Sequence, residues 1–289
     1  MLKIVEKKKI WFTISILIIV IGFGFMFTKG MNFGIDFRGG TQVVINMGTD
    51  FNKTDVDKIV DEYSKDAVTN QVNGTELQIK AKELNSSQVN DIFKALKEKY
   101  DLKDDALVSQ NEIGASVGRD LTTNAIVALV IAVIGMLIYV VIRFEFSFGI
   151  AAIIALLHDV LITISVYAVF GITINTPFIA AILTIVGYSI NDTIVIFDRI
   201  RENRKKLRGK SVEEIADMSI TQTMSRSINT TLTTLITIVC VYIFVPTVRD
   251  FAFPLIVGIA SGACSSIFIA SPIWCILANR QKNKKAGNK

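Results

Sequence analysis

The sequence predicts a polytopic α-helical membrane protein, with six transmembrane helices and one small α+β domain inserted between the first and the second helix. Three observations predict this class. Hydrophobic residues make up 51% of the 289 residues. Six stretches reach or approach the roughly 20 apolar residues that a spanning helix needs. Residues 30–120, by contrast, are polar and acidic, with 11 Lys and Arg against 16 Asp and Glu.

The six expected spans cover approximately residues 10–28, 124–142, 147–169, 177–198, 226–246 and 252–278. Pro254 and Pro272 lie in the last of them, where we expect a kink or a departure from the hydrocarbon. The first span follows a basic run, as in a signal peptide, but residues 23–27 lack the small-residue cleavage pattern. We therefore expect an uncleaved signal anchor.

Basic residues predict the orientation of the spans. In a six-span arrangement nearly all of them fall on one side, and the opposite short loops carry only Arg249. The positive-inside rule therefore places both termini in the cytoplasm. We divide the chain into a cytoplasmic N-terminus with the first helix (1–29), an extracytoplasmic domain (30–120), helices two to six (121–279) and a basic cytoplasmic tail (280–289). The net charge of +5 reflects these short loops, so nucleic acid is not an expected partner.

The inserted domain reads as strand, helix, hairpin, helix and strand. Residues 41–46 alternate as a half-buried strand does, and residues 53–63 carry apolar side chains at helical spacing, with Thr54 as the expected cap. Asn73-Gly74 is a hairpin signal, and a second helix follows Ser86 or Ser87, either of which would cap it. This order predicts a ferredoxin-like fold. The domain has no cysteine or histidine and no nucleophile with a base, so we expect no enzyme active site here.

Asp192 lies in the middle of the fourth span, where a charge costs about 2.5–3.5 kcal/mol on insertion scales. Such a residue either pairs with a partner or functions through its charge. Arg226 opens the fifth span. Polar residues share a helical face with each of the two, and those on which we base a proton relay are Asn191, Thr230, Thr233 and Thr237. Small movements of Arg226 relative to Asp192 would switch the proton affinity of the carboxylate. The alternative is a static Asp192–Arg226 pair that holds two helices together.

His158 and Asp159 form a second polar site, inside the third span. They either extend the proton relay or pin the third helix to its neighbours. His158 is the only histidine, and the three cysteines (Cys240, Cys264 and Cys275) lie in spans without CxxC spacing. We therefore predict no metal site, no disulfide framework and no cofactor.

Four segments resemble the SecF family, membrane subunits of the bacterial Sec preprotein translocase. Gly34-Ile-Asp-Phe-Arg-Gly-Gly40 is similar to its GIDFRGG signature, and the segment beginning Gly187-Tyr188 is similar to its fourth-span signature. Residues 157–161 and 225–234 match its third and fifth spans. Within the first signature, Gly34, Gly39 and Gly40 are expected to permit tight backbone geometry, and Asp36 and Arg38 to pair locally. We expect a structural link here, with preprotein contact as the alternative.

The resemblance implies a role late in protein export. A SecF-type chain acts with SecD, a homologous six-span protein that is a separate chain in this case, and resembles half of a resistance-nodulation-division transporter. It implies that Asp192 is the titrating residue and that the proton motive force drives release of the preprotein, although the residues leave proton and sodium coupling open. Implied partners are SecD, the SecYEG translocon, YidC-type accessory proteins, the preprotein and the lipid bilayer of the bacterial cytoplasmic membrane. The alternatives are a proton-driven small-molecule or lipid transporter and a passive assembly subunit.

Overall fold

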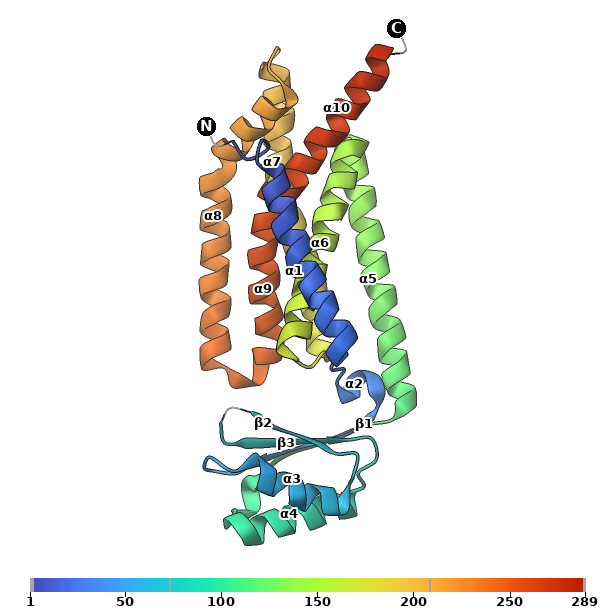
Figure 1. Ribbon diagram of the computed structural model, residues 1–289, viewed down its shortest axis with the longest axis vertical. Helices are drawn as coiled ribbons and strands as arrows, with labels where there is room; N and C mark the ends of the chain where they lie inside the picture. Colours follow the sequence, from blue (N-terminus) through green and yellow to red (C-terminus); the bar gives the residue numbers. More distant parts are fainter. Residues whose placement is uncertain (1–2, 73, 208, 288–289) are drawn as a thin grey trace. The chain divides into compact units, whose positions relative to one another are not determined.

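Six helices are long and apolar enough to cross a membrane in the described part of the chain, residues 3–72, 74–207 and 209–287 of a computed structural model (Figure 1). They are α1 (Lys8–Lys29), α5 (Ala115–Arg143), α6 (Phe146–Phe170), α7 (Thr176–Lys206), α8 (Val212–Phe244) and a last span in three parts. That span comprises α9 (Arg249–Ser265), the π-helical turn η3 (Ser266–Ala270) and α10 (Ser271–Gly287). The predicted polytopic helical class is confirmed.

The chain forms two units. One joins the residues up to Asn32 to those from Val127 onward and holds the spanning helices, and the other is Phe33–Ile126. In the helical unit, α6, α7 and α9 contact one another pairwise, α8 packs on α7 and α9, and α1 packs on α6. Roughly half of the apolar part of α6, α7 and the last span is buried, whereas α1, α5 and α8 expose most of their surface. The core of this unit is therefore α6, α7 and α9.

Two glycines let α9 approach α7 closely. Gly258 and Gly262 are four residues apart and lie on one face of α9. A Cβ at Gly258 would overlap the side chain of Ile185, and a Cβ at Gly262 would lie 3.0 Å from the Cβ of Ser189. Small residues at this spacing are the usual means by which membrane helices pack at short distance. The contact brings the hydroxyl groups of the two helices within hydrogen-bonding range.

The helices extend beyond the predicted spans at one end of this unit. α7 continues to Lys206, and α8 begins at Val212 rather than near 226. A capping box starts α8, since the Ser211 hydroxyl accepts from the amide of Glu214 (3.2 Å) and the Glu214 carboxylate accepts from the amide of Ser211 (2.9 Å). Hydropathy locates only the apolar part of a helix, so these polar extensions were not predicted.

The irregularity expected in the last span is a π turn directly before Pro272. Proline has no N–H to donate to the carbonyl one helical turn back, and one additional residue per turn accommodates that loss. The hydroxyl of Ser271 donates a hydrogen bond to the carbonyl of Ser266, five residues earlier (3.0 Å). Pro254 lies inside α9, near its beginning.

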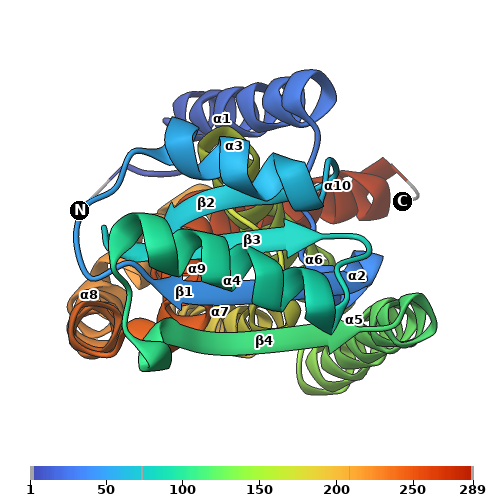
Figure 2. The same ribbon diagram turned by 90° about the horizontal axis from the view of Figure 1, so that it is seen from below.

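The second unit has the predicted order of strands and helices. After the short helix α2 (Ile35–Arg38) come β1 (Gly40–Asn46), α3 (Lys53–Tyr63), β2 (Val68–Val72), β3 (Glu76–Ala81), α4 (Ser86–Tyr100), the 3₁₀ turn η1 (Asp104–Ala106) and β4 (Leu107–Ile113). The sheet is antiparallel with order β2-β3-β1-β4. Figure 2 shows α3 and α4 covering one face of it. Val43, Ile45, Leu77 and Ile79 point into the core beneath these helices.

Both predicted caps in this unit were wrong by one or more residues. Asn52 rather than Thr54 caps α3, and its side chain accepts from the amide of Thr54 (3.0 Å). Asn85 rather than Ser86 or Ser87 caps α4, in a capping box with Gln88. Asn caps as well as Ser or Thr do, so several adjacent candidates are equivalent in the sequence. Of the predicted hairpin pair, Asn73 lies outside the described residues, and Gly74 has a φ of 81°.

Candidate functional site

Asp192 is buried in the helical unit and only half satisfied. It lies on α7 with 8% of its surface exposed. Ser227 of α8 donates a hydrogen bond to Oδ1 (3.0 Å). Oδ2 is buried and has no hydrogen-bond partner among the described residues, and the same holds for the hydroxyl of Thr231, one turn further along α8. A buried carboxylate oxygen without a donor is costly while the group is charged. This oxygen is therefore a suitable place for a proton.

Arg226 is next to Ser227 in the chain but does not form an ion pair with Asp192. Its side chain is exposed on α8, and none of the ion pairs between described residues involves it. The static Asp192–Arg226 ion pair, one of the two alternatives from the sequence, is not formed between these described residues, although the charge of Arg226 is close enough to interact with the carboxylate. A hydroxyl group, not a cation, links α8 to the carboxylate.

The side chains of the predicted threonine stripe on α8 are exposed rather than buried against α7. Thr230, Thr233 and Thr237 are exposed, and the hydroxyls of Thr233 and Thr237 donate to carbonyls of their own helix (2.9 and 3.0 Å). Asn191 on α7 is exposed as well. These residues therefore do not line a path inside this chain. Periodicity showed that they share a stripe, but not on which side of the bundle that stripe lies.

The polar contact between α7 and α8 uses other residues. Ser227 and Thr231 are buried against α7. The hydroxyl of Tyr188 bonds Thr234 Oγ1 (3.0 Å) and the carbonyl of Thr230 (3.2 Å). Ser227, Thr231 and Thr234 recur every three to four residues, so the helical period that found the neighbouring stripe could have found this face too.

Asp159 is fully buried and fully satisfied. Three serine hydroxyls donate to its carboxylate: Ser189 of α7 to Oδ2 (2.6 Å), and Ser261 and Ser265 of α9 to Oδ1 and Oδ2 (2.7 and 2.8 Å). Nδ1 of His158 lies 3.1 Å from Oδ1, while its Nε2 is buried without a partner among the described residues. A carboxylate has about four acceptor positions. All of them are occupied here, and the bonds join α6, α7 and α9 at one point.

Further hydroxyl groups lie between the neighbourhoods of the two aspartates. Thr193 follows Asp192 in α7, and its hydroxyl lies 2.8 Å from that of Ser266 in the π turn. Ser265, directly before Ser266, donates to Asp159. None of these three hydroxyl residues was predicted to belong to the site. Serine and threonine are small and cheap to place in an apolar helix, so they give little signal in hydropathy.

The GIDFRGG segment forms a compact connection within the second unit. Gly39 and Gly40 have φ values of 75° and 126°, which favour glycine. A Cβ at Gly40 would lie 2.5 Å from the carbonyl oxygen of Ala81, and one at Gly118 of α5 would lie 3.1 Å from the amide nitrogen of Gly39. Gly34 has an ordinary extended backbone, with φ −68°. The two later glycines thus meet the expected need for tight geometry.

Three other members of the two family signatures have less constrained surroundings. The guanidinium of Arg38 lies over the ring of Phe33 (5.7 Å), and its local pairing with Asp36 stays a prediction. Gly187 is exposed on α7, and a Cβ there would meet no atom within 4 Å. Nothing within the described chain requires a glycine at this position.

Two family profiles match the chain. The one described as "Protein export membrane protein SecD/SecF, C-terminal" matches residues 92–280, and "SecD/SecF GG Motif" matches residues 24–51. Protein translocase subunit SecF of Petrotoga mobilis is 37% identical and covers 98% of both chains. SecF of Sebaldella termitidis is 39% identical, over 98% of this chain and 94% of that one.

Longer relatives contain a corresponding region. Protein translocase subunit SecDF of Thermus thermophilus is 36% identical over 94% of this chain and 38% of its own length. A crystal structure of SecDF from the same organism, described as a translocon-associated membrane protein, matches with a TM-score of 0.88 and 34% identity, over 96% of this chain and 39% of that one. A super-membrane-facing form of SecDF matches with a TM-score of 0.73 and 32% identity, over 100% of this chain and 40% of that one. This chain therefore spans about two fifths of the fused SecDF proteins.

Proposed function

Because this chain belongs to the SecD/SecF family of protein export membrane proteins, we propose that it acts with a separate SecD chain and uses the proton motive force to drive late preprotein translocation and release. The observation that carries this proposal is the half-satisfied carboxylate of Asp192 inside a spanning helix. The export role is common to the relatives, whereas the coupling to protons rests on this site.

Asp192 binds the proton on Oδ2, the oxygen that has no partner among the described residues. Ser227 keeps its bond to Oδ1 in both protonation states, because a hydroxyl can donate to a carboxylate and, more weakly, to the carbonyl oxygen of a carboxylic acid. Movement of α8 that brings Arg226 against Oδ2 favours the charged form and expels the proton. Proton binding and release thereby alternate with two positions of α8.

Exposed polar groups on α7 and α8 support a SecD-type partner in the membrane. Asn191, Arg226, Thr230, Thr233 and Thr237 are exposed on spanning helices, where contact with lipid would be costly for the amide and the guanidinium. A second six-span bundle would cover them. Gly187, on the same part of α7, leaves room for close approach of a partner helix. The SecDF relatives carry both names in one protein, which supports the pairing.

The Asp159 cluster has a structural role in this proposal. Three serine hydroxyls and Nδ1 of His158 occupy the acceptor positions of its carboxylate, so the group joins three helices at one point. Of the two alternatives from the sequence, pinning α6 to its neighbours is therefore the better supported. The contact between Nδ1 and the carboxylate fixes the ring of His158, and this residue does not extend the proposed relay.

Charge distribution supports the orientation and the remaining partners. Basic residues at the ends of α7 and α10 favour a cytoplasmic position for both termini, in the cytoplasmic membrane of a bacterium. The acidic domain then lies on the outer side, where a preprotein emerges. The SecYEG translocon and YidC-type accessory proteins are proposed neighbours in the membrane.

The decisive experiment measures preprotein release from sealed vesicles that contain this chain and its SecD partner, with the gradient imposed and then collapsed. Asp192→Asn should abolish the gradient-dependent part of release while the complex stays assembled. Asp198→Asn is the matched control, because that carboxylate lies on the same helix and pairs with Arg201 (3.0 Å) and Arg143 (3.7 Å). Loss of the complex in Asp192→Asn would indicate a scaffold, and an unchanged gradient effect would refute coupling through this residue. Replacing protons by sodium in the gradient distinguishes the two ions.

A further inference from the structure

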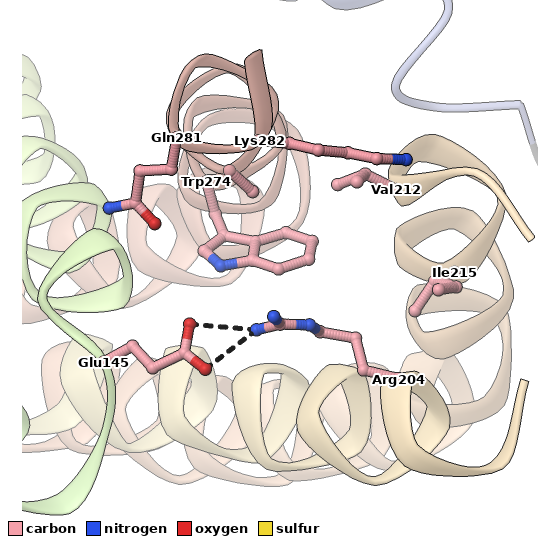
Figure 3. Close-up of a pocket in the computed structure, with 8 residues that line it drawn as sticks. Glu145, Arg204, Val212, Ile215, Trp274, Gln281 and Lys282 are labelled. Carbon is pink, nitrogen blue, oxygen red and sulfur yellow. Dashed lines mark hydrogen bonds and ion pairs between the residues drawn. The ribbon is translucent and has the colours of Figure 1, made fainter. Parts of the chain in front are cut away.

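A cavity at one end of the helical unit has no role in the mechanism above. It has a volume of about 480 Å³ and lies between the segment that precedes α6, the end of α7, the first turns of α8 and α10 (Figure 3). Its polar groups come from Glu145, Arg204, Trp274, Gln281 and Lys282, and Val212 and Ile215 form an apolar wall. This is the size of many small-molecule sites in proteins.

Trp274 contributes a buried donor that has no acceptor. The residue is 1% exposed, and its indole nitrogen forms no hydrogen bond within the described residues. Figure 3 shows the nitrogen edge of the ring turned toward the Glu145–Arg204 pair. A buried indole N–H usually has a partner, so one left without an acceptor at a cavity wall points to a ligand with an acceptor oxygen.

Arg204 adds donors of its own. Its Nη1 bonds both carboxylate oxygens of Glu145 (3.0 and 3.1 Å), and its guanidinium lies over the Trp274 ring, 5.8 Å from the centroid. Nε and Nη2 form no hydrogen bond in the described part of the chain. Glu145 and the ring therefore fix the plane of the guanidinium and leave the remaining N–H groups available.

We propose that this cavity binds a phosphate group, as carried by a membrane phospholipid or by free inorganic phosphate. With Lys282 there are two cations and one carboxylate around the cavity, which leaves one excess positive charge. The donors are N–H groups from three side chains, and a phosphate oxygen accepts from each of them. The apolar wall of Val212 and Ile215 suits the glycerol end of a lipid. The site is independent of the proposed proton coupling.

Trp274 itself reports on occupancy. The chain has two tryptophans, so Trp11→Phe leaves Trp274 as the only one, and phenylalanine preserves the ring stack on Phe268 (4.0 Å). The purified full chain in neutral detergent is titrated separately with short-chain phosphatidylglycerol, short-chain phosphatidylcholine and inorganic phosphate, while the fluorescence of Trp274 is recorded. We expect a saturable change with phosphatidylglycerol. Saturation by inorganic phosphate at the same concentrations would identify the free ion as the ligand.

Replacement of the two cations by glutamine tests whether Arg204 and Lys282 bind the phosphate group. Removing two charge-assisted hydrogen bonds through Arg204→Gln with Lys282→Gln should weaken binding about tenfold or more. Lys205→Gln is the control for Arg204, because it removes one positive charge from the same helix end but does not line the cavity, and the affinity of this variant should stay within about twofold. Lys282→Gln alone removes an exposed side chain and serves if the double variant does not fold. Absence of a saturable change, or an equal loss in Lys205→Gln, would overturn the proposal.

Discussion

The same substitution should cost much more stability at one buried aspartate, Asp159, than at the other, Asp192. In Asp159→Asn, the amide group replaces an oxygen that accepts two hydrogen bonds, so Ser189 and Ser265 lose their acceptor at Oδ2. Ser261 keeps an acceptor, but a neutral one. Charge-assisted bonds are about twice as strong as neutral ones, and bonds inside membranes average about 0.6 kcal/mol with a maximum near 1.7. The free energy of unfolding should therefore fall by about 2–4 kcal/mol.

Asp192→Asn should change that free energy by less than about 1 kcal/mol. Of the described residues, only Ser227 bonds this carboxylate, and the amide oxygen of asparagine can accept the same bond. No donor is displaced at Oδ2, because none is present among the described residues.

The assay is equilibrium unfolding of the full chain in mixed micelles by SDS titration, with both variants measured under the same conditions. A double-mutant cycle of Asp159→Asn with Ser261→Ala should show that the two share an interaction, since the hydroxyl contributes less once its acceptor is neutral. Equal losses in the two asparagine variants, or a larger loss in Asp192→Asn, would refute the distinction between a saturated and a half-satisfied site.

Three predictions concern the second unit and are measured by amide hydrogen exchange of its strands in the full chain. Gly40→Ala should abolish protection, because it combines a φ of 126° with a Cβ 2.5 Å from the Ala81 carbonyl oxygen. Asn85→Ala removes the cap of α4 and should lower local stability by about 1 kcal/mol. The Ser64 hydroxyl (2.7 Å), followed by the Lys82 amide, lowers the pKa of Asp66 from its ordinary value of 3.8, so this carboxylate stabilises the fold above that pH and the contribution is lost as pH falls below it. Asp66→Asn should remove that part of the acid sensitivity.

Matched controls separate the causes. Gly48→Ala introduces a similar positive-φ strain, 71°, with no atom within 4 Å of the new Cβ, so it should cost less than Gly40→Ala. Ser86→Ala changes a helix residue next to the cap and should stay within about 0.5 kcal/mol of the parent. Asp91→Asn alters an exposed carboxylate on α4 and is the control for the loss of one negative charge. Equal effects within any pair would contradict the corresponding reasoning.

Most of the fold could be predicted from the sequence, because hydropathy and alternation are patterns of residues that are close together in the chain. Length and hydropathy fix a spanning helix, and alternation fixes a half-buried strand, so the order of elements in both units was predictable. Polar extensions such as the start of α8 at Val212 depend on capping rather than on hydropathy, and they were missed. The choice of Asn85 over two adjacent serines depends on where the backbone leaves the extended conformation, which sequence alone does not determine.

Within the candidate site, only the residues that are costly to bury in a membrane could be predicted from the sequence. A carboxylate in a spanning helix stands out, and Asp192 and Asp159 are both buried as such residues should be. Their partners do not stand out, since Ser227 and Ser261 cost little anywhere in an apolar helix. Helical period placed Arg226 and Thr233 on one stripe, but the side of the bundle that the stripe faces is a property of packing.

The distribution of polar bonds separates a fixed part of the helical unit from an adjustable one. Asp159 joins α6, α7 and α9 through a saturated carboxylate, and the glycine contacts of α9 hold it tightly on α7. α8 meets α7 through the Ser227–Asp192 bond, the bonds of Tyr188, and the bonds of Arg199 and Asn203 to Gln222 and Ser219, all of which are to neutral groups on α8. Neutral bonds between hydroxyls and helix surfaces are weaker than the cluster at Asp159 and exchange partners readily. If proton binding at Asp192 moves any element, the balance of these bonds favours α8, which also carries Arg226.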